Sequence, residues 1–541
     1  MDPDFCKGKL VVSRYRFFVL HFGLLLAVLL ATLDQALVAS ALRSIAIEMN
    51  NKAGYLPYIG SAYGISMIPS LLLCEKIAPH FGLKWAFLLA LLVFEAGSTV
   101  CSRASNMESL VVGRAISGFG AGGLILLYMT LTSKIVSVQD EVLLFFKNDS
   151  AFEGFAGIML FISAIASPSL GGFFADFDWR YCFYIEMLLG VIPAVIVYRY
   201  LDFSAEKVNT EVDESVSSAD ENIDYLGVGS LFASITCLIV PLQLYQVSWD
   251  WKSAQSICMY TFSLLFFLAF VFIEWRVAKD PVVPRLMFVN STVPSMMVTS
   301  FCIGATFICG LWNVALFFQI NFNDNQTIAG AYIIPGFFGL LVGASVAKRM
   351  TARFDNYTFA FYVGPIILAG GIWLLAFLDD DSLVVERICY LGVFGFGEGV
   401  LHLTRSMALR AASPKKLSFR FVILALACLV FGSAFSITIS GTVLKTIFSA
   451  NVSDSIPIQT AGDALKSKGI HVVAPVDPFR LLKDLAAESG AIGNGSIFKE
   501  AVVEMLRCYN NAYRIAFLCL LPYPLIMLCL APFVKQYPMD D

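Results

Sequence analysis

Residues 17–37 read FFVLHFGLLLAVLLATLDQAL, and this stretch decides the fold class. It has the length of about 20 residues that a helix needs to cross the hydrocarbon core of a bilayer. His21 and Asp34 are its only ionisable side chains. It follows a basic arm that begins at Lys7, and it is too long for the apolar region of a cleavable signal peptide. We therefore expect a first membrane span that stays in place.

The composition of the whole chain agrees with a membrane protein. Of its 541 residues, 58% are hydrophobic and 14% are charged, whereas soluble domains carry nearer a quarter charged residues. The net charge of −4 offers no basic surface for nucleic acid. The 13 cysteines show no CxxC spacing, which argues against a zinc or iron–sulfur site. We expect an all-α polytopic membrane protein.

Hydrophobic stretches of span length recur along the chain. We predict about fourteen transmembrane helices, with boundaries uncertain by several residues. They lie at Phe17–Leu37, Pro57–Leu73, Trp85–Cys101, Leu110–Leu131, Phe155–Phe174, Tyr181–Tyr198, Leu226–Leu244, Ile257–Ile273, Val298–Phe318, Gly330–Ala347, Phe359–Leu378, Ile388–Leu409, Phe421–Leu444 and Ile515–Val534.

Lysine and arginine in the short loops fall on one side of this helix count, which predicts that this side and both termini are cytosolic. Two hydrophilic stretches interrupt the spans. Residues 201–224 are rich in Asp, Glu and Ser and form a predicted cytosolic linker. Residues 450–510 form a predicted extracytosolic loop. Sequons that would be glycosylated on that outer side begin at Asn325, Asn451 and Asn494.

Six segments, in order, resemble signatures of a known family. The chain is similar to fourteen-helix drug:proton antiporters of the major facilitator superfamily, and specifically to their fungal members. The segments that carry the resemblance are LDQALVASAL at 33–42, GRAISGFGAGG at 113–123, SPSLGG at 167–172, WRYCFYI at 179–185, FIEWR at 272–276 and DPVVP at 280–284.

This resemblance implies the architecture and the transport mechanism. Residues 1–200 would form a six-helix bundle, 225–290 two inserted helices, and 291–541 a second bundle. Substrate would bind between the bundles near the midplane and be reached from either side in turn. In the fifth helix Pro168, Gly171 and Gly172 match the antiporter motif, which suits a hinge or a close contact between helices.

The loop after the second helix departs from the family pattern. Phe81, Gly82 and Lys84 remain, but Glu75, Pro79 and Leu83 replace a glycine, an aspartate and an arginine. In the family the aspartate helps to hold the cytosolic gate, and proline offers neither its charge nor its hydrogen bonds. This divergence predicts a relaxed gate.

Ionisable residues inside a membrane cost about 2.5–3.5 kcal/mol at a helix centre and need a reason. Our candidates for coupling protons to substrate are Asp34, Arg114, Glu95 and Glu153. The family links the arginine to proton transfer. The alternatives are a fixed hydrogen bond for Asp34, a structural counter-ion for Arg114 and a packing role for Glu95.

Two further carboxylates, Glu186 and Glu398, fall in or near spans where the family has other residues. Several carboxylates around one cavity would favour cationic cargo. Glu186 is near a helix end, so we expect it to extend toward the interface.

The sequence thus predicts a proton-coupled antiporter that exports small organic, amphipathic or cationic compounds. The open alternatives are a siderophore carrier, a vacuolar basic amino-acid carrier and a non-transporting sensor or scaffold. No nucleophile–base pair or metal-ligand spacing suggests an enzyme. We expect no cofactor beyond the proton gradient, and small-molecule substrate, protons and lipid as partners. The expected form is a monomer in the plasma membrane or, alternatively, the vacuolar membrane.

Overall fold

The computed structural model describes most of the chain. The described residues are 14–49, 56–137, 166–201, 224–245, 249–321, 326–379, 382–414, 417–467, 481, 485 and 495–537. Glu153, Asn325, Asn494 and nearly all of the predicted 201–224 linker lie outside them.

Helices account for nearly all of the described segments. The α-helices are α1 (Arg14–Glu48), α2 (Leu56–Phe81), α3 (Leu83–Ser102), α4 (Met107–Ser137), α6 (Tyr181–Tyr200), α8 (Tyr225–Leu244), α9 (Ala254–Phe272), α10 (Thr292–Asn321), α11 (Gln326–Ala331), α12 (Ile334–Phe354), α13 (Ala360–Ala376), α14 (Val384–Ala412), α15 (Ser418–Asp454), α16 (Ile456–Ser467), α18 (Gly495–Leu518) and α19 (Pro522–Leu530). Residues 166–177 are also helical.

Eleven helices in the described part are long and apolar enough to cross a membrane. The predicted fifth, eleventh and twelfth spans are not among them. Only the end of the fifth is described, α13 is a shorter apolar helix, and α14 carries several charged residues. The all-helical membrane fold is confirmed, whereas the count of fourteen is not.

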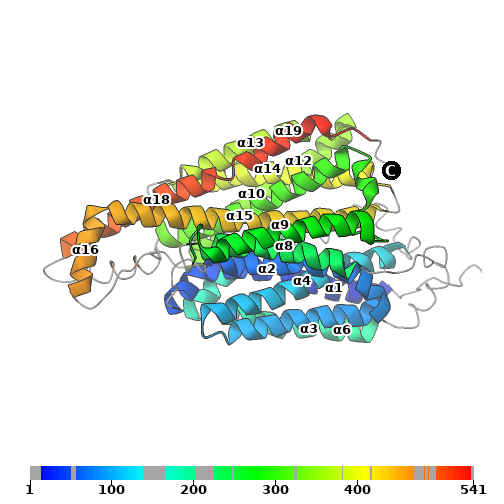
Figure 1. The fold of residues 1–541 in the computed structure, drawn as a ribbon, viewed down its shortest axis with the longest axis horizontal. Coiled ribbons are helices and arrows are strands. Elements are labelled where there is room, and N and C mark those ends of the chain that lie inside the picture. The colour runs from blue at the N-terminus through cyan, green and yellow to red at the C-terminus, as the bar shows by residue number, and fades with distance from the viewer. Residues whose placement is uncertain are drawn as a thin grey trace, which may run out of the picture.

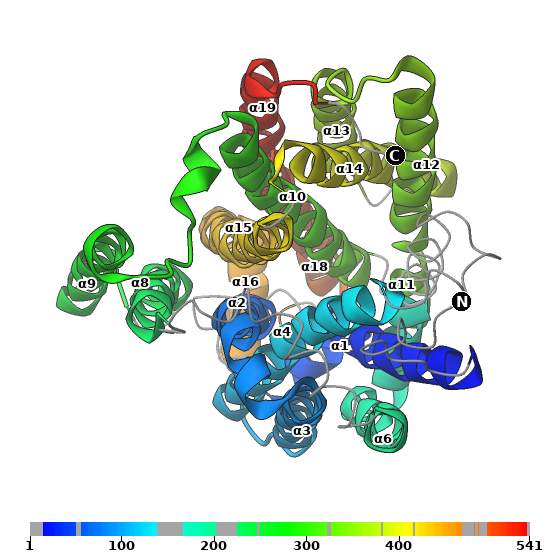
Figure 2. The same ribbon diagram turned by 90° about the vertical axis from the view of Figure 1, so that its right-hand side faces the viewer.

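The helices run side by side along the long axis of the molecule (Figure 1) and form two groups. Seen from the end, α1, α2, α3, α4 and α6 gather in one group, and α10, α12, α13, α14, α15 and α19 in the other (Figure 2). The helices α8 and α9 stand at one edge, with α8 next to α2. The helix α15 packs against α2, and α10 against α1, so these pairs form the boundary between the groups.

Glycines set the close packing inside each group. Gly118 of α4 lies against the backbone of Tyr63 on α2, and Gly120 lies against Phe94 on α3. In the other group, Gly395 of α14 lies against the backbone of Gly336 on α12. A methyl group at any of these positions would overlap its neighbour, so small residues let the backbones touch, as is common between membrane helices.

Several predicted boundaries were wrong. The helix α1 continues to Glu48, well past Leu37, and the last span begins within α18, which starts at Gly495 and not near Ile515. The predicted 450–510 loop contains α16, which lies beyond the end of the bundle in Figure 1. Asn451 is part of α15, and its side-chain amide donates to the backbone oxygen of Cys508 at 3.4 Å. Its predicted glycosylation stays untested.

Candidate functional site: a buried charge cluster and a cytosolic ion network

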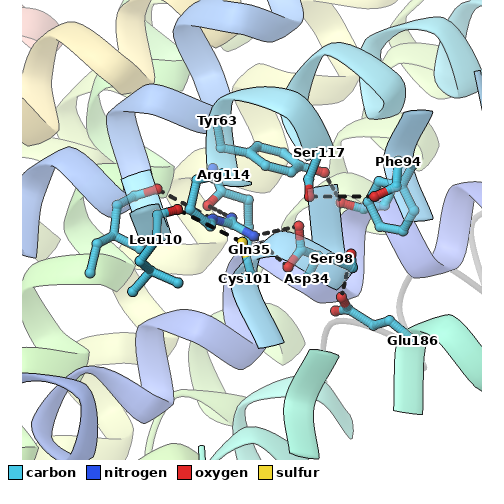
Figure 3. Close-up of polar contacts among 12 residues, drawn as sticks. Asp34, Gln35, Tyr63, Phe94, Ser98, Cys101, Leu110, Arg114, Ser117 and Glu186 are labelled. Atoms are coloured by element: carbon cyan, nitrogen blue, oxygen red, sulfur yellow. Dashed lines mark hydrogen bonds and ion pairs between the residues drawn. The ribbon is translucent and has the colours of Figure 1, made fainter. Parts of the chain in front are cut away.

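An ion pair lies inside the first group of helices (Figure 3). Arg114 Nη1 of α4 is 2.5 Å from Oδ1 and 2.6 Å from Oδ2 of Asp34 on α1. Both side chains have no exposed surface. The two residues that the sequence singled out separately are therefore partners. Fixed pairing, which was the structural alternative for each, and participation in transport are compatible in such a geometry.

Neighbouring groups hold the guanidinium in place. Arg114 Nη2 donates to Gln35 Oε1 at 3.2 Å, and Nε donates to the backbone oxygen of Ile59 at 3.4 Å. The guanidinium lies over the ring of Tyr63 at 4.4 Å from its centroid, and the Tyr63 hydroxyl donates to Ala31 O at 2.6 Å. Helices α1, α2 and α4 thus all contribute to positioning one positive charge.

Two more carboxyl groups join this cluster. Glu186 of α6 is 1% exposed and interacts electrostatically with Asp34 and Arg114, so the expectation that it extends to the membrane interface was wrong. Ser98 Oγ donates to Glu186 Oε2 at 3.4 Å, while Oε1 has no hydrogen-bond partner. Glu95 of α3 also lies within electrostatic range of Asp34, and neither of its carboxyl oxygens has a hydrogen-bond partner.

We call Asp34, Glu95, Arg114 and Glu186 the buried charge cluster. Within the described part it combines three carboxyl groups with one guanidinium. The sequence missed Glu186 because its place near the start of α6 suggested the membrane surface. The contact of α6 with both α1 and α3 buries it instead.

The antiporter motif packs beside this cluster. Gly171 lies against α1, where an added Cβ would be 2.5 Å from the backbone oxygen of Leu37, close to Asp34 in the sequence. Gly172 is buried as well, and Pro168 touches Gly330 of α11 through its backbone oxygen. The motif therefore touches α1 on one side and the second group of helices on the other.

A second set of charges joins the two groups at the predicted cytosolic end. Arg420 of α15 donates through Nη1 and Nη2 to Asp280 at 2.7 Å and 2.9 Å, and its Nε is 3.3 Å from Glu75 Oε1 of α2. Lys76 Nζ is 3.3 Å from Asp280 Oδ2 and donates to Asp280 O at 2.7 Å. We call Glu75, Lys76, Asp280 and Arg420 the cytosolic network.

The charges of this network are complementary. Burial alone would raise the pKa of Asp280, but the hydrogen bonds and charges of Arg420 and Lys76 outweigh burial and lower it below the ordinary aspartate value. Asp280 is thus a carboxylate at neutral pH. In the sequence, Glu75 is a departure from the family pattern and Asp280 is part of DPVVP, but no local signal links either residue to Arg420.

The remaining residues of the predicted gate loop behave differently. Phe81 is exposed, and Gly82 has φ 80°, a left-handed conformation that favours glycine and lets α3 start directly after α2. Lys84 Nζ lies 5.0 Å from the centroid of the Tyr198 ring on α6, within the first group. The side chain of Pro79 lies outside the described part. Glu75 and Lys76, near the end of α2, supply ion pairs that join the groups at this end.

The groups also meet at the opposite, predicted outer end. Gln319 of α10 donates through Nε2 to the backbone oxygen of Ala39 at 2.9 Å and accepts from the Arg43 N–H at 3.1 Å. Thr327 Oγ1 donates to Asp176 Oδ2 at 2.9 Å. Polar contacts between the groups therefore exist at both ends. Across the described ranges, no three His, Cys, Asp or Glu side chains gather as a metal site would need.

Comparison with known proteins decides the family. The sequence profile of the Major Facilitator Superfamily matches residues 24–437. The chain belongs to this superfamily. It is therefore an integral membrane transporter of small molecules and not an enzyme, and transporters of this superfamily generally need no cofactor.

Relatives in this superfamily include efflux pumps. The MFS-type efflux pump elcC of Phaeosphaeria nodorum is 27% identical over 74% of this chain and 70% of its own length. Multidrug resistance protein 3 of Bacillus subtilis is 27% identical over 80% of each chain. In fold, the chain is similar to a bacterial homologue of the human lysosomal transporter Spinster, with a TM-score of 0.57, 12% identity, and coverage of 97% of this chain and 98% of that one.

Proposed function

We propose that this superfamily member is a proton-coupled antiporter that exports small amphipathic or cationic organic compounds. The observation that carries the proposal is the fully buried Asp34–Arg114 pair with Glu186 and Glu95 beside it. The export direction is supported by the relatives named as efflux pumps.

The charge balance of the buried cluster supports proton binding. Three ionised carboxyl groups beside one guanidinium would leave net negative charge buried between the helices, which is costly. The cluster is neutral when two of the three carboxyl groups carry a proton. Glu186 and Glu95 offer carboxyl oxygens without hydrogen-bond partners for those protons.

Exchange then follows from competition for the same negative charge. When protons leave the cluster, its carboxylates attract a cation, and when the cation leaves, protons replace it. A neutral amphipathic compound can be exchanged as well if its binding alters the Asp34–Arg114 contact. The positive charge of Arg114 balances one carboxylate, and it therefore sets the number of protons that the cluster needs to be neutral. Arg114 thus has a part in coupling beyond that of a structural counter-ion.

The cytosolic network supplies a gate in this proposal. Glu75 takes the place of a small family residue and forms an ion pair with Arg420 across the two groups, while Asp280 holds Arg420 from the segment after the inserted helices. These contacts take the place of those that the family aspartate makes, because Pro79 occupies the position of that aspartate here. In this proposal the cytosolic gate is held by charge pairs that differ from the usual ones, in place of the relaxed gate that the loop sequence predicts.

The test is transport in reconstituted vesicles under an imposed pH gradient, with a panel of amphipathic cations, neutral organic compounds, siderophores and basic amino acids. Wild-type protein should move amphipathic or cationic members. Asp34→Asn keeps size and hydrogen bonding but removes the titrating group, so gradient-driven flux should be abolished. Because it also leaves Arg114 without its ion-pair partner, flux is compared per mole of monodisperse protein.

Undiminished gradient-driven flux in Asp34→Asn would remove Asp34 from coupling. Movement of siderophores or basic amino acids alone would favour those carriers. If no panel member moves, the proposal fails and a non-transporting role gains support. Asp178→Asn is the control, because this residue pairs with Arg180 at 3.5 Å at the end of the bundle and is half-exposed.

A further inference from the structure

A second acidic residue lies at the centre of the other group of helices. Glu398 is midway along α14 (Val384–Ala412) and has no exposed surface. Its neighbours Gly395 and Gly399 lie against the backbone of α12, and Gly397 lies against α13. The glycines on either side of Glu398 bring these backbones into close contact, so the middle of α14 is packed on two further helices.

This carboxyl group lacks a counter-charge. One of its oxygens is hydrogen-bonded with the Thr306 hydroxyl of α10, and the other has no hydrogen-bond partner. In the described part, no basic side chain forms an ion pair with it. Arg405, two turns along α14 and thus roughly 10 Å away along the helix axis, donates to Ser300 and Ser406 instead.

The charged and titratable groups of the surrounding elements are few. From α10, Cys302 is near Glu398, and on α14 itself His402 and Arg405 follow it. From α15, Cys428 faces Arg405 rather than Glu398. The basic residues of α12 (Lys348, Arg349 and Arg353) lie in its last turns, and α13 has no Asp, Glu, Lys, Arg or His.

The hydrogen bonds of Thr306 indicate which group holds the proton. Its hydroxyl is 2.9 Å from the backbone oxygen of Cys302 and 3.2 Å from that of Ile303, in addition to its contact with Glu398. A hydroxyl has one hydrogen to donate. When Thr306 donates to the Cys302 carbonyl, as helical threonines commonly do, the contact with Glu398 is a hydrogen bond only if the carboxyl group donates.

We propose that Glu398, with Thr306 as its acceptor, is a second proton-binding site, located in the C-terminal group of helices. The proton is held in this conformation, and it leaves to water when α14 and α10 separate enough to hydrate the carboxylate. Its part in transport rests on the antiport function proposed above, whereas proton binding itself does not. If both the buried charge cluster and Glu398 bind and release protons during transport, Glu398 adds one proton to each transport cycle.

Infrared difference spectroscopy of the purified full-length protein tests proton binding directly. A protonated carboxylic acid has a carbonyl stretch that shifts in heavy water and disappears on ionisation. We expect a band that titrates with pH and is lost in Glu398→Gln but kept in Glu386→Gln. Glu386 is a matched control because it lies in the exposed first turn of the same helix. Thr306→Val should shift the band, and this second variant decides the result if Glu398→Gln does not fold.

Bands of Glu186 and Glu95 would remain in every variant, so the Glu398 band is the one that the wild-type spectrum has and the Glu398→Gln spectrum lacks. If the two spectra have the same protonated-carboxyl bands, or if the missing band never exchanges or titrates, the site is overturned. The transport role is tested in vesicles with ethidium, an amphipathic cation, by finding the membrane potential that balances a fixed ethidium gradient. The number of protons exchanged per ethidium should fall by one in Glu398→Gln and stay unchanged in Glu386→Gln. An unchanged number refutes the transport role. Wild-type protein that moves no ethidium contradicts the antiport proposal for this cation, and the infrared result then decides the site.

Discussion

Replacing Arg114 by glutamine should be among the most destabilising changes in the first group of helices. The variant removes the positive charge of a pair in which both side chains are fully buried, so no water can take its place beside Asp34. Breaking a buried pair by removing one partner costs about 3–5 kcal/mol. The contact of the guanidinium with the Tyr63 ring adds about 0.5–2 kcal/mol. We expect a loss of unfolding free energy of roughly 3–5 kcal/mol, since proton uptake by Asp34 recovers part of the cost.

The double variant Asp34→Asn, Arg114→Gln should be more stable than Arg114→Gln alone. It removes both charges and leaves two amides that are able to hydrogen-bond to each other. Replacing a whole buried pair by neutral groups is often close to neutral. The coupling energy between the two positions should therefore be large and favourable, of order 3 kcal/mol, at the upper end of the range for residues in contact.

Thermal unfolding of the detergent-purified protein, followed by the loss of monodisperse material, measures this cycle. Arg180→Gln is the control, because Arg180 pairs with Glu48 at 2.6 Å but both side chains are partly exposed. Such a pair contributes about 0–1 kcal/mol. The reasoning is refuted if Arg114→Gln unfolds at the same temperature as Arg180→Gln, or if the effects of the two single changes simply add.

Three further predictions concern the gate and the packing. Arg420→Ala removes the partly exposed contacts to Glu75 and Asp280, worth about 1 kcal/mol, and should raise the reactivity of engineered cysteines at the cytosolic end roughly fivefold. Because the pKa of Asp280 is lowered, the contribution of its own ion pairs is complete above the ordinary aspartate pKa of about 3.9 and is lost only as pH falls below it. The ratio of cysteine reactivity in wild-type protein to that in Arg420→Ala cancels the pH dependence of the thiol itself, and it should stay constant between about pH 5 and pH 8. Gly171→Ala should cost about 1–3 kcal/mol by overpacking against α1, measured by thermal unfolding.

Each of these has a control. Lys84→Ala should leave cysteine reactivity at wild-type level, because Lys84 contacts α6 within its own group; equal effects of Lys84→Ala and Arg420→Ala would contradict the gate. A wild-type to Arg420→Ala ratio that moves toward one as pH falls from 8 to about 5 would show that Asp280 is not held as a carboxylate. Gly370→Ala should be neutral, since nothing lies within 4 Å of an added Cβ. A cost as large as that of Gly171→Ala would mean that overpacking is not the cause.

The sequence predicted the helices and the ionisable site residues better than it predicted which side chains pair with each other. Hydropathy located the helices because each span is a local property, and Asp34 and Arg114 stood out as charges within apolar segments. Their pairing was not predictable, since α1 and α4 come together only through tertiary packing. Glu186 was misplaced for the same reason, because its distance from the end of α6 says nothing about α1 and α3, which cover it. In the loop after α2, the loss of the family aspartate suggested a weak gate, and the compensating Arg420 lies far along the chain on α15.

The edge formed by α8 has a consequence for how lipid-soluble compounds enter. Gln243 of α8 donates to Ser61 of α2 and, at 2.9 Å, to Thr438 of α15, and Thr442 of α15 donates to Leu242 O at 3.0 Å. One inserted helix thus binds both groups where α2 and α15 meet, and α8 lies over that seam with α9 packed on its far side. A hydrophobic compound that diffuses in the bilayer toward this seam would meet α8 before it reached the boundary between the two groups.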